Sequence, residues 1–420
     1  MRVAILGVGT VGEAVARILV RNASIITARA GKSIEPVVGV VRDLNKPRDV
    51  AGMHLSTDLS AVLERDDIDV YVELMGGVDG AYAAIKRVLE RKKPVVTANK
   101  ALLAYHRDEL ARLSADVPFG YEASVAGGIP IIKTLRDGLS ANHIISIKGI
   151  LNGTSNYIMT SMMKGGVKFK DVLKRAQELG YAEADPTFDV GGFDAAHKLL
   201  ILSSIAYDIH ARPEDILIEG IENISSDDIA FAKEFEYEIK LLAIARRIGE
   251  RVELRVHPAL VPKDKMIAKV NGVMNAISVA GDAVGETMYY GAGAGGNATA
   301  SAVISDLIDI ARGINPPMLG YKAPIAPLSL VPKGEIQSKF YFRLNVEDAV
   351  GVLAKITKIM SEHALSADAF LQRRDDENSL EATLFFITHT AFEKDAVKFM
   401  QILKSSDFVR GEIFMMRIEE

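Results

Sequence analysis

The chain has 420 residues, 49% of them hydrophobic and 25% charged, with a formal net charge of −5 at pH 7 and no cysteine. This composition excludes collagen-like, disordered and disulfide-rich proteins, and the slight negative charge gives no electrostatic reason to expect nucleic acid or a membrane as a partner. Without cysteine, thiolate metal sites and thiol nucleophiles are excluded; with no recognisable signal peptide at the start, we expect a cytoplasmic protein of two or three domains.

The N-terminal part of the chain predicts an α/β nucleotide-binding domain. The run RVAIL at 2–6 is typical of a strand, and it ends in GVGTVG before a segment with apolar residues at helical spacing. Further strand-like runs alternate with helical segments and lie at 36–41, 70–75 and 94–99. This alternation indicates a parallel sheet covered by helices, extending to about residue 128.

A G-x-G-x-x-G sequence joins the first strand to the first helix. Glycines at these places permit a tight turn, close approach of a pyrophosphate and close packing of the helix on the strand. We therefore predict that a dinucleotide binds here, and the candidate residues are Gly7, Val8, Gly9, Thr10, Val11 and Gly12. The alternative is a glycine-rich turn that binds nothing.

Two further residues follow strands of this domain. Arg42 precedes Asp43 at the end of the second strand, where arginine suits the 2′-phosphate of NADP and an acidic residue suits the ribose of NAD. The order favours NADP without excluding NAD, and a solvated Arg–Asp pair is the alternative. Lys100 follows the fourth strand, at the edge where open parallel sheets bind ligands, and is either functional or a solvated charge.

From about Ile131 the pattern becomes α+β, with strands expected at HIISIKGIL and RVELRVHPALV. Within it, Asp194 and Lys198 are four residues apart and share one face of a helix whose remainder is almost wholly apolar. Isolated buried charge is costly, so these side chains are either a functional pair or a structural ion pair. His197 points elsewhere, and we interpret it as structural.

Glycine-rich stretches at 121–130 and 291–300 allow close backbone approach, either to a ligand or between packed segments. Residues 316–332 contain five of the 14 prolines and predict a linker. After it, residues 339–420 alternate as strand, helix, strand, strand, helix, strand, which suffices for a small independent domain.

Several motifs together resemble the homoserine dehydrogenase family: GVGTVG, VVTANK, YEASVAGGIP, LNGTSNYI, GYAEADPTFDVGGFDAAHK and GAGAGGNATASAV. The C-terminal part resembles an ACT domain, a regulatory module of βαββαβ order. No kinase-like segment precedes the first strand, so the resemblance implies the monofunctional form. It also implies four parts: a Rossmann-type domain at 1–128 with a returning segment near 295–315, a catalytic and dimerisation domain at 129–320, a linker at 321–338 and an ACT domain at 339–420.

The family interconverts L-aspartate 4-semialdehyde and L-homoserine with NAD(P), a step towards threonine, methionine and isoleucine. By resemblance, Lys198 is the proton donor and Lys100 a second lysine at the reacting oxygen and the cofactor. The resemblance implies that Glu183 and Asp194 hold the substrate amino group and orient the lysine, and that Gly295 binds the cofactor.

The resemblance further implies a sodium-type cation, which suits oxygen ligands, on main-chain oxygens around Glu122, Val125, Gly127 and Ile129. A homodimer or homotetramer and feedback by threonine are also expected. The tail departs from the common ACT pattern, because Ala349 and Val350 stand where a proline before Gly351 is frequent.

Two other functions make different demands on the sequence. Aspartate-semialdehyde dehydrogenase acts on the same metabolite through a cysteine thiolate, which this chain lacks. A catalytically silent regulator that binds a dinucleotide and an amino acid is the remaining alternative, and the four charged residues Lys100, Glu183, Asp194 and Lys198 argue against it.

Overall fold

The computed structural model describes residues 1–50, 52–374 and 379–420, and they form two compact units. Unit 1 is assembled from Met1–Gly153, Asp194–Pro213 and Met274–Leu328. Unit 2 is assembled from Thr154–Phe193, Glu214–Val273 and Ser329–Glu420. The chain therefore passes between the units several times, and each unit is described by itself.

Unit 1 begins with the predicted parallel sheet, which among the described residues has the strand order β3-β2-β1-β4-β5-β6. Its strands are β1 (Arg2–Leu6), β2 (Glu35–Val40), β3 (His54–Ser56), β4 (Val70–Glu73), β5 (Val95–Thr97) and β6 (Phe119–Gly120). The sequence does not predict β3 and β6, because their residues, HLS and FG, form no apolar run. The order reverses between β1 and β4, so a ligand crevice is expected at the carboxyl ends of these strands.

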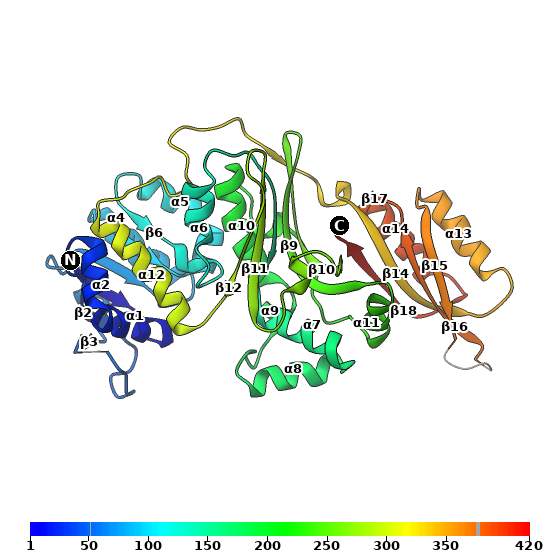
Figure 1. Ribbon diagram of the computed structural model, residues 1–420, viewed down its shortest axis with the longest axis horizontal. Helices are drawn as coiled ribbons and strands as arrows, with labels where there is room; N and C mark the ends of the chain where they lie inside the picture. Colours follow the sequence, from blue (N-terminus) through cyan, green and yellow to red (C-terminus); the bar gives the residue numbers. More distant parts are fainter. Residues whose placement is uncertain (51, 375–378) are drawn as a thin grey trace. The chain divides into compact units, whose positions relative to one another are not determined.

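The helices that accompany this sheet are α1 (Thr10–Arg21), α2 (Ala23–Ala30), α3 (Leu59–Leu63), α4 (Asp79–Glu90), α5 (Lys100–Leu113) and α12 (Gly296–Ala311). Figure 1 shows α12, from late in the chain, alongside α1 and α2. Val303 and Leu307 of α12 share a buried cluster with Val15 of α1 and Ile5 of β1. A distant segment thus completes the core on which α1 packs.

Unit 1 also contains an antiparallel ladder that consists of β12 (Gly285–Ala292), β11 (Met274–Gly281) and β7 (Ile144–Ile150). β7 is the strand predicted at HIISIKGIL. The short helix α6 (Ile131–Lys133) precedes it, and α10 (Phe193–Tyr207) is buried along nearly its whole length, as its apolar sequence predicts. β7 and α10 are the elements that carry part of the site described below.

Unit 2 is built on the long hairpin of β9 (Tyr237–Ile248) and β10 (Arg251–Pro262), to which β8 (Leu217–Ile218) and β13 (Ser329–Leu330) add short parallel pairings. β10 is the strand predicted at RVELRVHPALV. The helices of this unit outside the C-terminal part are α7 (Gly153–Gly165), α8 (Phe169–Glu178), α9 (Thr187–Val190) and α11 (Ser226–Glu234). Residues 316–332 all lie in the described part and hold β13 but no helix, as their prolines predict.

The C-terminal part of unit 2 has the predicted order of strand, helix, strand, strand, helix, strand, with a short β17 added. Its elements are β14 (Gln337–Glu347), α13 (Val352–Glu362), β15 (Ala367–Arg373), β16 (Glu381–Thr388), β17 (Ala391–Phe392), α14 (Glu393–Lys404) and β18 (Val409–Ile418). Phe342, Phe386 and Phe399 form the centre of its core, and β18 runs parallel to the end of β10.

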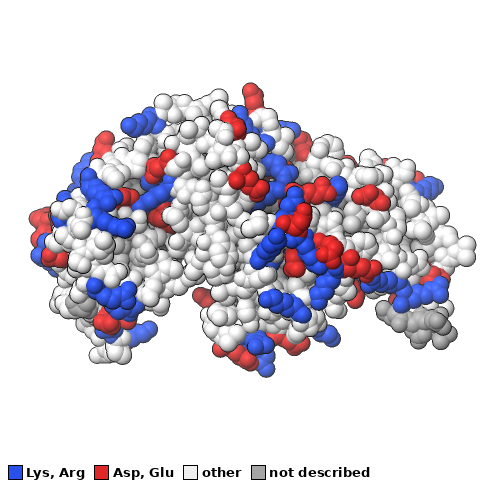
Figure 2. Space-filling model, viewed as in Figure 1, with Lys and Arg blue, Asp and Glu red and all other residues white. Residues whose placement is uncertain are grey.

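In the part of the chain that the structure describes, no helix is both long enough and apolar enough to cross a bilayer. Basic and acidic side chains are interspersed over the face shown in Figure 2. This mixture agrees with the small net charge of the chain.

Candidate active site

A cavity of about 640 Å³ lies against the glycine turn of unit 1, at the carboxyl ends of β1 and β2. Gly7, Val8 and Gly9 line it, together with the predicted Arg42. A second cavity of about 430 Å³ shares Val8 and Gly9 with it and is also lined by Thr10. The structure thus brings most of the predicted cofactor residues together. Val11 and Gly12 stand in the first turn of α1, outside the described lining of either cavity.

The glycines of the turn have different surroundings. Gly7 has a φ of +99°, and a Cβ there would lie 2.5 Å from the carbonyl oxygen of Leu74. A Cβ at Gly12 would lie 2.5 Å from the carbonyl oxygen of Gly7, whereas one at Gly9 would meet no described heavy atom within 4 Å. Gly7 and Gly12 are therefore required by packing, while Gly9 leaves open space, which is the arrangement that a pyrophosphate needs.

Lys46 and Arg48 line both cavities, and sequence reasoning missed them. Arg48 donates from Nε to the carbonyl oxygen of Val8 at 2.8 Å and from Nη1 to that of Asp43 at 2.8 Å. It therefore holds the loop after β2 against the glycine turn. The available signal was the recurrence of basic residues shortly after Arg42, which suits phosphate groups.

Asp194 is the centre of a buried ion cluster in unit 1. Its Oδ2 accepts hydrogen bonds from Lys198 Nζ at 2.7 Å and from Asn152 Nδ2 at 2.8 Å, while its Oδ1 pairs with Lys100. Lys198 also donates to the carbonyl oxygen of Leu151 at 2.7 Å. Lys100 and the Asp194–Lys198 pair, two independent predictions from the sequence, therefore meet at one place.

Local structure explains this meeting. Asp194 and Lys198 are one turn apart on α10, and Lys100 is the first residue of α5, which Asn99 caps by accepting from the N–H of Leu102 at 3.1 Å. The Asp194 side chain is 2% exposed, that of Lys198 10% and that of Lys100 37%. Lys100 is thus the side of the cluster that is open to a ligand.

The charges of this cluster depend on one another. Burial alone would raise the pKa of Asp194, but the ammonium groups of Lys198 and Lys100 hold it well below its ordinary value. The carboxylate therefore remains ionised and fixes both lysines. Two cations that converge on one site can stabilise negative charge on a substrate oxygen.

Asn152 was not singled out from the sequence, although it belongs to the LNGTSNYI motif; no periodicity marks it. His197, interpreted as structural, is buried and its ring lies edge-on to Tyr105, with centroids 5.5 Å apart. Glu183 belongs to unit 2, where it is exposed between α8 and α9 and its carbonyl oxygen accepts from Gln177 Nε2 at 3.1 Å.

The predicted cation residues lie on an irregular segment before α6, where Ala126 (φ 53°) and Gly127 (φ 46°) are left-handed. Both carboxylate oxygens of Glu122 accept backbone N–H groups, from Ile132 and Lys133, at 2.9 Å each. Burial, and the nearby Asp306, raise the pKa of Glu122 to about 7. Because this carboxylate is engaged, a cation would depend on main-chain oxygens; among the described residues no group of three or more His, Asp or Glu could hold a metal.

The two glycine-rich stretches pack on each other. The N–H of Gly128 donates to the carbonyl oxygen of Ala292 at 3.0 Å, and a Cβ at Gly127 would lie 2.7 Å from the carbonyl oxygen of Gly293. Gly295 precedes α12 with a φ of +121°, and its neighbour Gly296 lines the smaller cofactor cavity. The packing alternative is therefore observed, and the second stretch also reaches the cofactor cavity.

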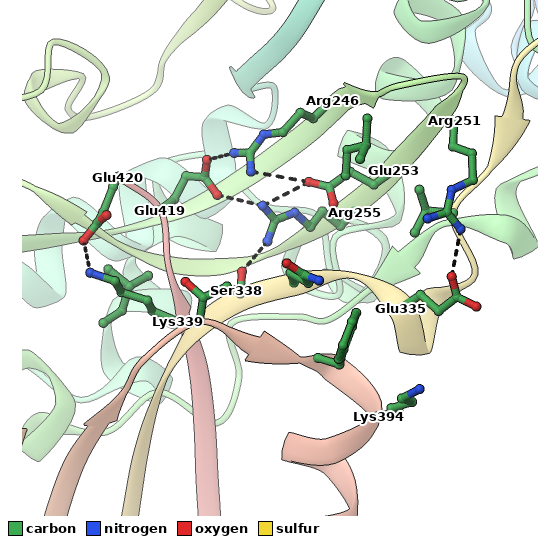
Figure 3. Close-up of a pocket in the computed structure, with 16 residues that line it drawn as sticks. Arg246, Arg251, Glu253, Arg255, Glu335, Ser338, Lys339, Lys394, Glu419 and Glu420 are labelled. Carbon is green, nitrogen blue, oxygen red and sulfur yellow. Dashed lines mark hydrogen bonds and ion pairs between the residues drawn. The ribbon is translucent and has the colours of Figure 1, made fainter. Parts of the chain in front are cut away.

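A further cavity, of about 520 Å³, lies within unit 2 between the β9–β10 hairpin and the strands β14 and β18 (Figure 3). Arg255 pairs there with Glu419 at 2.8 Å and with Glu253 at 3.3 Å, and Arg246 also pairs with Glu419. Its described lining includes none of the residues predicted from the sequence. Most of its charges pair with one another, and these ion pairs join elements of unit 2.

The chain is similar to known proteins along most of its length. Two family models match, "Homoserine dehydrogenase, NAD binding domain" over residues 7–117 and "Homoserine dehydrogenase" over residues 130–308. The homoserine dehydrogenase of Helicobacter pylori is 52% identical over 419 residues, covering 100% of this chain and 99% of that protein.

Solved structures agree. A crystal structure of a homoserine dehydrogenase from Thiobacillus denitrificans is 42% identical with a TM-score of 0.94, covering 100% of this chain and 98% of that one. A hyperthermophilic archaeal homoserine dehydrogenase in complex with NADPH is 26% identical with a TM-score of 0.64, covering 76% of this chain and 99% of that one.

Proposed function

The chain belongs to the homoserine dehydrogenase family, and from that membership we propose that Lys198 and Lys100 act on the oxygen of L-aspartate 4-semialdehyde. It is an NAD(P)-dependent oxidoreductase that interconverts this aldehyde with L-homoserine. The observation that carries the assignment of the lysines is their convergence on the buried carboxylate of Asp194.

The proposed chemistry follows from the residue types. A bound nicotinamide would supply hydride to the aldehyde carbon and, in the reverse direction, would accept hydride from the alcohol carbon of homoserine. As negative charge develops on the oxygen, Lys100 and Lys198 stabilise it, and Lys198 Nζ delivers the proton that completes the alcohol. In the reverse direction neutral Lys198 accepts the hydroxyl proton of homoserine. Asp194 stays ionised throughout and orients both lysines.

Two recognition roles complete this proposal. Arg42, with Lys46 beside it at the cavity, favours NADP over NAD because these cations suit a 2′-phosphate. Glu183, an exposed carboxylate of unit 2, is proposed from the resemblance alone to bind the substrate ammonium. Gly7 to Gly12 and Gly295 hold the dinucleotide.

Further proposals rest on the resemblance and on the element order. A monovalent cation, Na⁺, is held by main-chain oxygens around Glu122, Val125, Gly127 and Ile129. Residues 339–420 act as an ACT domain that is regulated by threonine, a proposal supported by their βαββαβ order. The proposed domains before it are residues 1–128 and 129–320, followed by a linker at 321–338. The enzyme is a homodimer or a homotetramer. Its location is the cytoplasm, a proposal supported by the lack of cysteine in the sequence.

The decisive experiment is an assay of NADPH oxidation with L-aspartate 4-semialdehyde, run beside a titration of NADPH binding, for the wild type and for variants of both lysines. We expect turnover in the wild type and a large loss of turnover in both variants, with NADPH binding retained in Lys198→Ala. Binding of NADPH without turnover in the wild type would instead favour the silent regulator.

A further inference from the structure

Glu73 is a buried carboxyl group that the chemistry described above does not use. It is the last residue of β4, its exposure is 0%, and it lies in register between Leu6 of β1 and Thr97 of β5. This is the point where the strand order reverses, which is where open α/β sheets bind their ligands. Burying a carboxylate is costly unless its oxygens are hydrogen-bonded, so the contacts of Glu73 indicate what the charge does.

The two oxygens of Glu73 reach into different loops. Oε1 accepts from the N–H of Met75 at 2.8 Å, and Oε2 accepts from the hydroxyl of Thr97 at 2.6 Å. Met75 lines the 640 Å³ cavity at the glycine turn. One oxygen therefore fixes the wall of the dinucleotide cavity, and the other fixes the end of β5.

The contacts continue from β5 to the start of α5. The Thr97 hydroxyl oxygen accepts from the N–H of Asn99 at 3.0 Å, and the Asn99 side chain caps α5 at Leu102. Asn99 Nδ2 also donates to the carbonyl oxygen of Gly77 at 2.6 Å, which ties the loop after β4 to the same cap. The next residue is Lys100.

We propose that Glu73 is a positioning residue that couples the dinucleotide cavity to Lys100, through Met75 on one side and through Thr97 and Asn99 on the other. The inference rests on the role proposed above for Lys100. A carboxylate fits the task because both of its oxygens accept, whereas a glutamine must present an NH₂ group either to the Met75 N–H or to Thr97. Thr97 fits because its hydroxyl donates to Glu73 while accepting from Asn99.

The contacts of Glu73 form two arms, one through Met75 to the cavity and one through Thr97 and Asn99 to Lys100. The two arms can be disrupted separately. Thr97→Val keeps the shape of the side chain but removes the hydroxyl, so only the arm to Lys100 is broken. Thr97→Ser keeps the hydroxyl and is the matched control. Glu73→Ala removes both acceptor oxygens and therefore disturbs both arms. We expect Thr97→Val to lower kcat by roughly 10- to 100-fold, since small displacements of a catalytic group have effects of this size, while the Kd for NADPH stays within about twofold.

We expect Thr97→Ser to stay close to the wild type in both quantities, and Glu73→Ala to lower kcat and also weaken NADPH binding. In a Lys100→Ala background, Thr97→Val should lose most of its effect on kcat, because contacting partners in one pathway are not additive. The readouts are steady-state kinetics, NADPH titration and thermal melting of the full chain.

Different results identify different failures. If Lys100→Ala alone keeps wild-type turnover, the proposed role of Lys100 is wrong, whatever Thr97 does. If Lys100→Ala is impaired but Thr97→Val matches Thr97→Ser in kcat, or lowers kcat equally with and without Lys100, the positioning role of Glu73 is overturned. A lower melting temperature of Thr97→Val with unchanged kcat would likewise show that the hydrogen bonds of Glu73, Thr97 and Asn99 stabilise the fold but do not position Lys100.

Discussion

Asp194 accepts a hydrogen bond at 2.7 Å from Lys198, one turn further along α10, and both side chains are buried. The sequence leaves open whether this is a structural or a functional pair. A structural pair needs one cation for one carboxylate, whereas here Lys100 pairs with the same carboxylate. The three side chains carry a net positive charge, which favours a site that meets developing negative charge on a substrate.

Replacing Lys198 with alanine should abolish most turnover without affecting cofactor binding. General acid–base groups contribute roughly 10²- to 10⁴-fold, so kcat for aldehyde reduction should fall by an amount in this range. The NADPH Kd should change little, because Lys198 lies on α10 and not on the glycine turn. Near-normal turnover in a folded Lys198→Ala protein would contradict the assignment.

Homoserine oxidation should be faster at alkaline pH. Lysine side chains ordinarily have a pKa of about 10.4, so the ammonium form needed for reduction is present at neutral pH, while the neutral amine needed for oxidation becomes common only as the pH rises. The measurement is the kcat for oxidation between pH 7 and 10, with a deuterium isotope effect to confirm that hydride transfer limits the rate. A flat profile under that condition would argue against a lysine base.

Asp194→Asn should move that profile as well as lower turnover. Asparagine keeps the shape but removes the negative charge that favours the ammonium form of both lysines. Loss of an opposite charge beside a buried amine lowers the pKa of the amine, so oxidation should reach its maximum at a lower pH than in the wild type. An unchanged profile together with normal kcat would mean that Asp194 does not control the lysines.

Arg42→Ala should discriminate between the two cofactors. Hydrogen bonds to charged groups contribute about 1.5–3 kcal/mol, so the KM for NADP should rise about tenfold or more while that for NAD changes little. Asp43→Ala is the matched control, since Asp43 is adjacent but outside the described lining of the cavity. Equal losses for NADP and NAD would exclude Arg42 from 2′-phosphate recognition.

What the sequence predicts well is local. The G-x-G-x-x-G turn and the Asp194–Lys198 spacing lie within one or two turns of chain, so periodicity and turn chemistry suffice to find them. The basic residues after Arg42 are visible in the sequence, but Lys46 and Arg48 are not predicted as cavity residues, because the folding of their loop onto Val8 brings them there.

Glu73 escapes for a related reason. It stands in the apolar run VYVELM, and nothing in that run reveals that two loops will supply donors to its carboxylate. Asn152 likewise becomes significant only when β7 ends beside α10 and its amide meets Asp194. Contacts between elements distant in the chain decide these roles, and a one-dimensional pattern does not contain them.

Lys240 on β9 provides a test of stability that is independent of catalysis. It is fully buried, and its Nζ donates to the carbonyl oxygen of Val270 at 2.7 Å and to Asn271 Oδ1 at 3.1 Å. Burial lowers its pKa from the ordinary 10.5 to about 8. Between these values the unfolded chain holds a proton that the folded chain has released, so this residue makes folding more favourable as the pH rises from 8 to 10.5.

The contribution cannot exceed about 1.4 kcal/mol per pH unit, and it is absent from Lys240→Met, which keeps the length of the side chain but does not titrate. Urea unfolding of both proteins should therefore show the wild type gaining stability relative to the variant as the pH is raised from 8 to 10. The comparison cancels other groups that titrate in this range, because both chains share them. A difference between the two midpoints that stays constant with pH would show that Lys240 does not release its proton on folding.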